Sequence, residues 1–110
     1  MEVRELLEKA IEEFNKKAQE DERVAKELEG MERMIVVRLN DDGAYHFLVK
    51  DKRAGLLQEG DVEGDIEIIS DSETLIALFN REMGPMKAIA TKRLKINASL
   101  QDMLRIRKFF

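Results

Sequence analysis

Residues 34–50 read MIVVRLNDDGAYHFLVK and predict an antiparallel β-hairpin. β-branched and aromatic side chains dominate 34–40 and 44–50, and a three-residue Asp-Asp-Gly step at 41–43 separates them. An Asp-Gly step supplies the positive φ that a tight hairpin turn needs. Side chains alternate along a strand, so each half of the hairpin presents one apolar row. These rows are Ile35, Val37 and Leu39, and then Tyr45, Phe47 and Val49.

The segment before the hairpin has the spacing of an amphipathic helix. Apolar residues recur at three-and-four intervals over residues 2–28, and Gly30 follows as a helix end. Five polar residues at 19–23 interrupt the apolar positions. One long helix and two consecutive helices with a bend at 19–23 both fit this pattern.

Three more strands are predicted after the hairpin. A weak one covers residues 54–58, and a clearer one covers 65–69 with Ile66 and Ile68 on one face. Short turns join these to the hairpin, which predicts an antiparallel meander of four strands. Residues 92–97 predict a fifth strand with Leu94 and Ile96 inward. It follows a helical connection of about 22 residues, which allows parallel pairing.

Helix-capping residues mark the remaining elements. Ser70 and Glu73 form a capping box that predicts a helix reaching Met83. Pro85 opens a further helix, and Ser99 caps the last one. At 110 residues the chain has the length of one domain. We therefore predict a single α+β domain over residues 1–110, with a five-stranded, mostly antiparallel sheet covered by helices.

Composition excludes most catalytic and metal chemistry. The chain has no Cys and one His, which leaves no disulfide, thiol nucleophile, Cys-ligated zinc or His cluster for a transition metal. It offers no nucleophile–base pair, and we predict that it is not an enzyme and needs no metal or cofactor. It also has no run of about 18 apolar residues and no basic-then-apolar leader, so we expect a cytoplasmic protein.

Charge is distributed unevenly along the chain. The formal net charge is −4, but residues 85–110 hold seven basic side chains and one acidic. This segment is either a solvated face or a contact for an anionic headgroup or bilayer surface. Nucleic acid is not an expected partner, because no aromatic residue is interleaved with these charges and the whole chain is acidic.

The last 46 residues carry a series of motifs in a distinctive order. They are DIEI at 65–68, LIAL at 75–78, GPMKA at 84–88, RLKI at 93–96, the small residue Ala98 and a helix over 100–108. In this order they resemble the sterol carrier protein 2 family. Gly84, Lys92 and Ala98 depart from the residues usual at those places in the family.

This resemblance implies a non-catalytic domain that binds or transfers a lipid in an apolar tunnel between sheet and helices. The ligand would be a fatty acid, fatty acyl-CoA, sterol or isoprenoid-like molecule. From the basic segment itself we expect transient contact with an anionic membrane surface. The predicted lipid-binding residues are Val37, Phe47, Val49, Leu75, Leu78, Phe79, Met86, Ile89, Met103 and Leu104. The predicted headgroup or membrane contacts are Lys92, Arg93, Arg105 and Arg107.

An alternative keeps the fold without the lipid. The terminal Phe109-Phe110 pair is an unusual ending, and another chain would cover it in a dimerisation or accessory module. A monomeric carrier and a homodimer are both open at this point.

Overall fold

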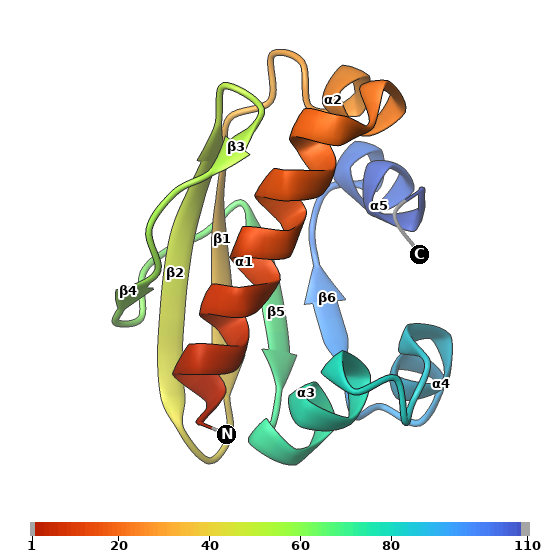
Figure 1. The fold of residues 1–110 in the computed structure, drawn as a ribbon. Helices are drawn as coiled ribbons and strands as arrows, with labels where there is room; N and C mark the ends of the chain where they lie inside the picture. The colour runs from red at the N-terminus through yellow and green to blue at the C-terminus, as the bar shows by residue number, and fades with distance from the viewer. Residues whose placement is uncertain (1, 109–110) are drawn as a thin grey trace.

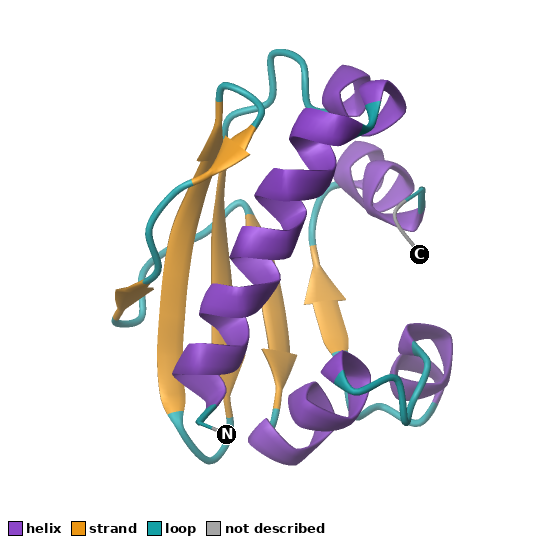
Figure 2. Cartoon of the chain, in the orientation of Figure 1, coloured by secondary structure: helices purple, strands orange, loops and turns teal. Residues whose placement is uncertain are grey.

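The computed structural model describes residues 2–108 (Figure 1). The helices are α1 (Val3–Glu20), α2 (Glu22–Glu27), α3 (Ser72–Phe79), α4 (Pro85–Ala90) and α5 (Leu100–Arg107). The strands are β1 (Arg33–Leu39), β2 (Gly43–Lys50), β3 (Arg53–Ala54), β4 (Gln58–Glu59), β5 (Ile66–Ser70) and β6 (Lys95–Asn97). Figure 2 shows α1 lying across the strands, with the shorter helices at the ends and side of the sheet. The α+β class with a mostly antiparallel sheet is confirmed.

The predicted hairpin forms the middle of the sheet. β1 and β2 pair antiparallel, with Ile35 opposite Phe47 and Val37 opposite Tyr45. Gly43 has a φ of 78°, so the Asp-Gly step makes the turn as predicted. The register places the two apolar rows on one face of the sheet.

The four-strand meander is wrong. β5 pairs parallel with β1, Val37 opposite Ile68, and β6 then pairs antiparallel with β5. The strand order is β3-β2-β1-β5-β6, and β4 also pairs with β2. Since β3 and β4 occupy the outer edge of β2, the next strand reaches the sheet at the other edge of β1. A parallel neighbour requires a crossover, which here is the connection over residues 60–65.

The predicted strand at 54–58 is divided into β3 and β4. Both short strands pair with β2, at Val49 and Tyr45 respectively. Between them the Gly55 N–H donates to the Leu48 carbonyl at 2.8 Å, and Leu56 is 84% exposed. The chain thus leaves the β2 ladder between Ala54 and Gln58, and Leu56 in this gap is exposed to solvent.

The helical segment before the hairpin consists of two helices. Asp21, between α1 and α2, has an extended backbone, and its carboxylate accepts from the Arg23 N–H at 2.9 Å. An Asp that caps a new helix in this way ends the preceding one. The bend predicted as one of two alternatives is therefore present.

The capping box at Ser70 is wrong by one residue. Asp71 is the N-cap of α3, and its carboxylate accepts from the Thr74 N–H at 2.8 Å. Ser70 instead ends β5, where it is buried and donates to the Arg93 carbonyl at 2.8 Å. The predicted cap at Ser99 and the predicted helix start at Pro85 are confirmed.

Two predicted elements are shorter than expected, and each is cut short near a residue with a left-handed backbone. The α3 helix stops at Phe79 and does not reach Met83, since Arg81 has a φ of 60°. Likewise, the last strand begins only at Lys95, because Lys92 has a φ of 63°. A positive φ interrupts both a helix and a strand.

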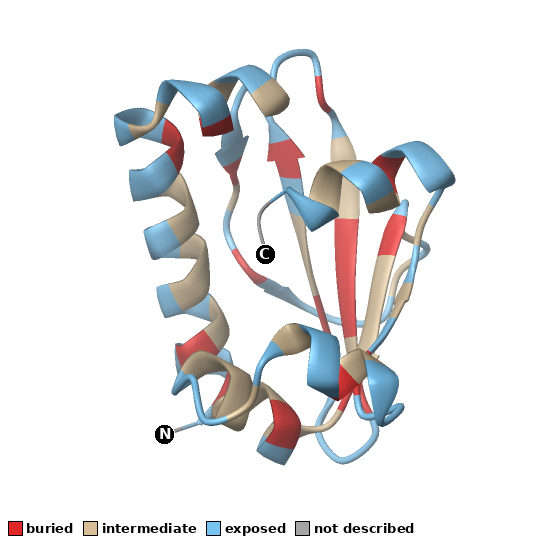
Figure 3. Ribbon diagram, turned by 90° about the vertical axis from the view of Figure 1, so that its right-hand side faces the viewer, coloured by how far each residue is buried: buried red, intermediate tan, exposed pale blue. Residues whose placement is uncertain are grey.

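The main core lies between the sheet and the first two helices. Ile35, Val37 and Val49 of the sheet are buried against this layer, and two apolar clusters share the space. Figure 3 shows buried stretches along the strands and on the inward side of α1. The buried helix residues in these clusters are Val3, Ala18 and Val24, together with Leu28 at the C-cap of α2.

The opposite face of the sheet is covered by the crossover rather than by a helix. Arg38 of β1 donates to Asp61 at 2.7 Å, to Glu67 at 2.6 Å and to the Val62 carbonyl at 3.0 Å. The fully buried Val36 lies beneath Gly64 of the same connection. The connection thus covers the middle of this face, whereas Leu48 on the same side is 38% exposed.

Gly64→Ala is expected to destabilise the domain by about 1–3 kcal/mol. A Cβ at position 64 would overlap Val36 Cγ2 and would lie 3.2 Å from the Met34 carbonyl oxygen, which is backbone and cannot swing aside. Gly84→Ala is the matched control, because a Cβ there meets nothing within 4 Å. Urea unfolding of both variants measures the difference. Equal stability of the two variants would contradict this account of the crossover.

Candidate functional site

The helix-side face of the sheet is incompletely covered at its middle. Tyr45 and Val49 of β2 are buried, yet Phe47 between them is only half-buried. In β5, Ile68 is half-buried between buried Ile66 and Ser70. The middle of a row is ordinarily its most protected part, so the partial exposure of these two apolar side chains is unusual.

Further half-buried apolar side chains pack against the same core clusters as Phe47 and Ile68. We call the set the central strip: Ile11 and Phe14 of α1, Phe47, Ile68 and Ile96 of the sheet, Leu75 of α3 and Ile106 of α5. Ile11, Phe47 and Ile68 pack against both core clusters. The strip therefore lies at the junction of the two clusters. Its members come from α1, the sheet, α3 and α5.

A buried ion cluster fixes α5 beside the strip. The Asp102 side chain is only 4% exposed and accepts from Arg33 at 2.9 Å and from Arg105 at 3.1 Å. The hydrogen bond that Arg33 donates to Asp102 raises the pKa of Arg33, so this guanidinium remains charged. Asp102 thus joins α5 to the start of β1 and holds Ile106 toward the core.

A second polar link positions α3. Asp41, in the hairpin turn, accepts from the Ser72 N–H at 3.0 Å and the Ser72 Oγ at 3.1 Å. The backbone hydrogen bond from Ser72 is the main cause of a lowered pKa for Asp41. The link is therefore complete above the ordinary pKa of an aspartate and weakens as pH falls through the lowered value. It fixes the first turn of α3, and with it Leu75.

The predicted lipid-binding residues fall into four groups. Val37 and Val49 are buried in the apolar rows of β1 and β2, and Phe47 and Leu75 belong to the strip. The half-buried residues outside the strip are Leu78, Phe79, Ile89 and Met103. Met86 and Leu104 are mostly exposed, so the fold does not enclose them. Contact of any of these residues with a lipid stays a prediction.

The predicted headgroup contacts differ in exposure and in ion pairing. Lys92, Arg93 and Arg107 are exposed, whereas Arg105 is held by buried Asp102. Arg105 is therefore a structural cation here. The Phe109-Phe110 pair lies outside the described residues.

Sequence reasoning did not assign five members of the strip to the site: Ile11, Phe14, Ile68, Ile96 and Ile106. Ile68 and Ile96 are opposite each other in the β5–β6 pair, which the predicted meander did not contain. The alternation within residues 65–69 does mark Ile68 as inward. What was missing is the neighbour of that strand in the sheet, which local pattern does not encode.

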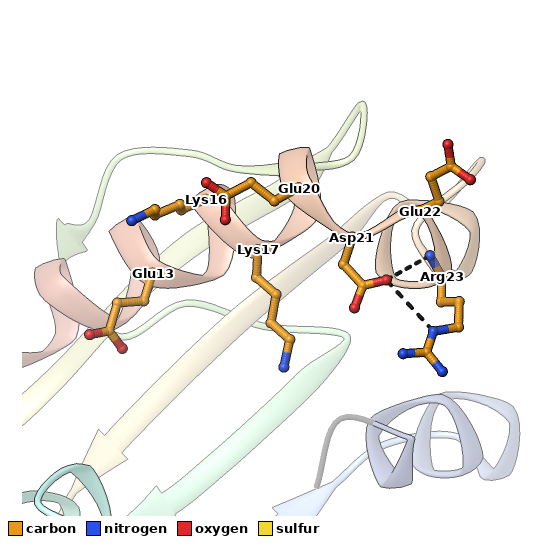
Figure 4. Close-up of a pocket in the computed structure, with 7 residues that line it drawn as sticks. All are labelled: Glu13, Lys16, Lys17, Glu20, Asp21, Glu22 and Arg23. Atoms are coloured by element: carbon orange, nitrogen blue, oxygen red, sulfur yellow. Dashed lines mark hydrogen bonds and ion pairs between the residues drawn. The ribbon is translucent and has the colours of Figure 1, made fainter.

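Three surface hollows lie away from the strip and are lined largely by charged side chains. One of about 680 Å³ is at the α1–α2 junction, where Lys17 and Asp21 lie among other charged residues (Figure 4). Others of about 440 and 350 Å³ lie near Lys108 and near Lys50. Such open, charged hollows are typical of a solvated surface and do not resemble an apolar binding site.

Residues 2–108 contain neither a metal-binding cluster nor a membrane-spanning helix. No group of three or more His, Cys, Asp or Glu side chains there is arranged to hold a metal ion. Within the same residues, no helix combines the length and the apolar character needed to span a bilayer.

The class of domain is thus an α+β fold in which helices cover one face of a mixed sheet and a half-buried apolar strip lies between them. The chain matches the SCP-2 sterol transfer family over residues 9–110 and belongs to that family. Domains of this family bind or transfer lipids and are generally non-catalytic. No curated protein sequence gives a significant match.

Solved structures with low sequence identity share the fold. Palmitated SCP2L2 from Aedes aegypti has a TM-score of 0.65 at 10% identity, and the match covers 99% of this chain and 94% of that one. The UbiJ-SCP2 ubiquinone synthesis protein has a TM-score of 0.65 at 15% identity, with coverage of 94% and 89%. The sec-alkylsulfatase Pisa1 from a Pseudomonas species has a TM-score of 0.59 at 13% identity. The match covers 76% of this chain but only 13% of the sulfatase.

Proposed function

We propose that this domain carries a single-chain lipid, such as a fatty acid or a fatty acyl ester, in the central strip. Half-burial of Phe47 and Ile68 in the middle of otherwise buried rows supports this most directly. A tail of about fourteen methylenes covering the strip would contribute on the order of 11 kcal/mol gross, before the cost of association. Binding of this kind needs apolar surface and no catalytic group.

The similarity to a palmitated protein of the same fold is consistent with an acyl chain. A sterol or isoprenoid-like ligand would use the same apolar surface, but β2, β5 and β6 each contribute one side chain, so the strip is a narrow row that crosses the strands. The acyl chain is our proposal because an extended tail fits such a row better than a rigid ring system does.

Direct binding measurements test this function. Protein purified from cells is extracted with organic solvent, and the extract is examined by mass spectrometry for co-purified lipid. Delipidated protein is then titrated with palmitate while its thermal unfolding is followed. A ligand at about 100 times its Kd should stabilise the domain by about 2.7 kcal/mol. An empty extract together with no shift in unfolding temperature would reject lipid carriage.

A further inference from the structure

The connection between β4 and β5, together with the strand ends that it joins, carries only acidic charge. Residues 59–67 contain five acidic residues and no basic one. Figure 1 shows the chain leaving β4, passing behind β2 and β1 and joining β5, which places it on the face of the sheet that α1 does not cover. Arg4 and Arg38 pair with three of the five acids, whereas the exposed Glu63 has no ion-pair partner among residues 2–108. The outward charge of the connection is therefore negative.

Two exposed leucines lie on the same side of the molecule as this connection. Leu48 of β2 is 38% exposed and shares a face of the strand with His46, whose Nδ1 is 3.0 Å from the Gly60 carbonyl oxygen in the connection. Leu56 is 84% exposed, and the N–H of the adjacent Gly55 donates to the Leu48 carbonyl at 2.8 Å. Apolar and acidic groups thus share one surface. We call it the acidic face, and it consists of Leu48, Leu56, Asp61, Glu63 and Asp65.

The last two helices expose apolar side chains at the other edge of the sheet. Met86 of α4 is 62% exposed, and Leu100 and Leu104 of α5 are 77% and 52% exposed. Leu100, Leu104 and Arg107 follow one another at intervals of four and three residues and therefore share one side of α5. Figure 1 shows both helices beyond β6, the edge strand. These side chains are separate from Leu56, which lies at the edge formed by β3 and β4.

The charge around these apolar side chains is positive. Lys92, Arg93 and Arg107 are exposed and have no ion-pair partner among residues 2–108. The one acidic residue within 85–110, Asp102, is buried and already bonded to two arginines. We call this surface the basic face, and it consists of Met86, Lys92, Arg93, Leu100, Leu104 and Arg107.

We propose that copies of this chain bind head to tail, with the acidic face of one copy against the basic face of the next. Each face combines exposed leucines, which exclude water on contact, with charge of one sign, which sets the orientation. A contact between two basic faces or two acidic faces places like charges together and is disfavoured. A second copy is the favoured occupant because the chain itself supplies the complementary surface.

The position of the two faces determines the form of the assembly. Because they lie at different sides of the molecule, a pair of copies leaves one acidic face and one basic face free. Such assemblies lengthen with concentration unless the rotation between copies closes a ring. The charges are exposed, so the contact is weak and depends on salt. Neither face contains a member of the central strip, and the association therefore does not depend on the proposed function.

Sedimentation velocity of the full chain tests the association. At low salt the weight-average sedimentation coefficient should rise as the protein concentration is raised to about 1 mM, the range in which weak contacts are populated. Raising the salt from about 0.05 M to about 0.5 M should lower the association constant about tenfold, because salt screens exposed charges. A parent protein that stays monomeric over this range overturns the proposal.

Two variants, each altered in one face, identify the surfaces. Leu56→Ser with Glu63→Lys alters the acidic face, and Leu100→Ser with Arg107→Glu alters the basic face. Each variant alone should lose at least about tenfold in association constant. An equimolar mixture should form a one-to-one pair with an affinity within about threefold of the parent, since each variant keeps the face that the other lacks. That pair should not grow longer, because its two free faces are the altered ones.

Matched charge reversals on α1 provide the control. Glu12→Lys and Lys16→Glu change exposed residues outside both faces and should leave the association constant within about twofold of the parent. Thermal unfolding shows whether each face variant is folded. Equal loss in the controls, or association of either face variant at the strength of the parent, overturns the proposal. So does a mixture of folded variants that stays monomeric, because a head-to-tail contact must be restored there.

Discussion

Asp102→Ala is expected to lower the free energy of unfolding by about 2–4 kcal/mol. The side chain of Asp102 is 4% exposed, and its removal leaves the guanidinium groups of Arg33 and Arg105 without their carboxylate. An unpaired charge held close to an apolar core is costly because the surroundings cannot solvate it. Both arginines keep some contact with water, which places the loss toward the lower part of the range for buried ion pairs. Chemical denaturation of parent and variant measures it.

Two further variants separate the ion cluster from a general effect of charge. Glu63→Ala removes one negative charge from an exposed position and should change stability by less than about 0.5 kcal/mol. Combining Asp102→Leu with Arg33→Met and Arg105→Met should recover much of the loss, because no charge then remains unpaired. If Asp102→Ala is as stable as Glu63→Ala, the cluster does not hold α5 in place.

Ile68→Asn is expected to weaken palmitate binding about ten- to hundredfold. Half-burial of Ile68 lets the new amide keep water contacts while the strip is empty, so the stability of the free domain should fall less than its affinity. A bound acyl chain removes that water, and the amide then has no hydrogen-bond partner among the apolar side chains of the strip. Titration of delipidated protein with palmitate measures the change in Kd.

The neighbouring residue gives a closely matched control. Ile69 is on the same strand, is also half-buried, and faces the other side of the sheet. Ile69→Asn carries the same cost in strand propensity but should leave palmitate affinity within about twofold of the parent. Equal loss of affinity in both variants would indicate damage to the fold and would remove the support for a site in the central strip.

Much of the fold could be predicted from short-range patterns in the sequence. The Asp-Gly turn, the apolar rows of β1 and β2, Pro85 at the start of α4 and the cap at Ser99 all depend on interactions within a few residues. Such interactions are repeated wherever the same short sequence occurs, so they are readable before any tertiary structure is known. The ends of α3 and β6 were misplaced because Arg81 and Lys92 adopt positive φ without being glycine.

The order of motifs over residues 65–110 pointed to the family, and the match over residues 9–110 confirms it. The site was predicted less completely. Phe47 and Leu75 were assigned to it from the sequence, and the structure places both in the central strip. Met86 and Leu104 were assigned to the same site because their helices are amphipathic, yet they lie on the surface. A short helix with apolar residues on two sides does not reveal which side meets the core.

The sequence by itself determined the hairpin, most helix starts, the absence of thiol and multi-histidine chemistry, and the family. Only the tertiary structure decided that β5 pairs parallel with β1, which places Ile68 beside Val37. It also decided that Asp102 is buried between Arg33 and Arg105. Each result depends on a pair of residues more than 30 positions apart in the chain, Val37 with Ile68 and Arg33 with Asp102. Local periodicity records which face of an element is apolar, but the partner of that face is fixed only when the whole core packs.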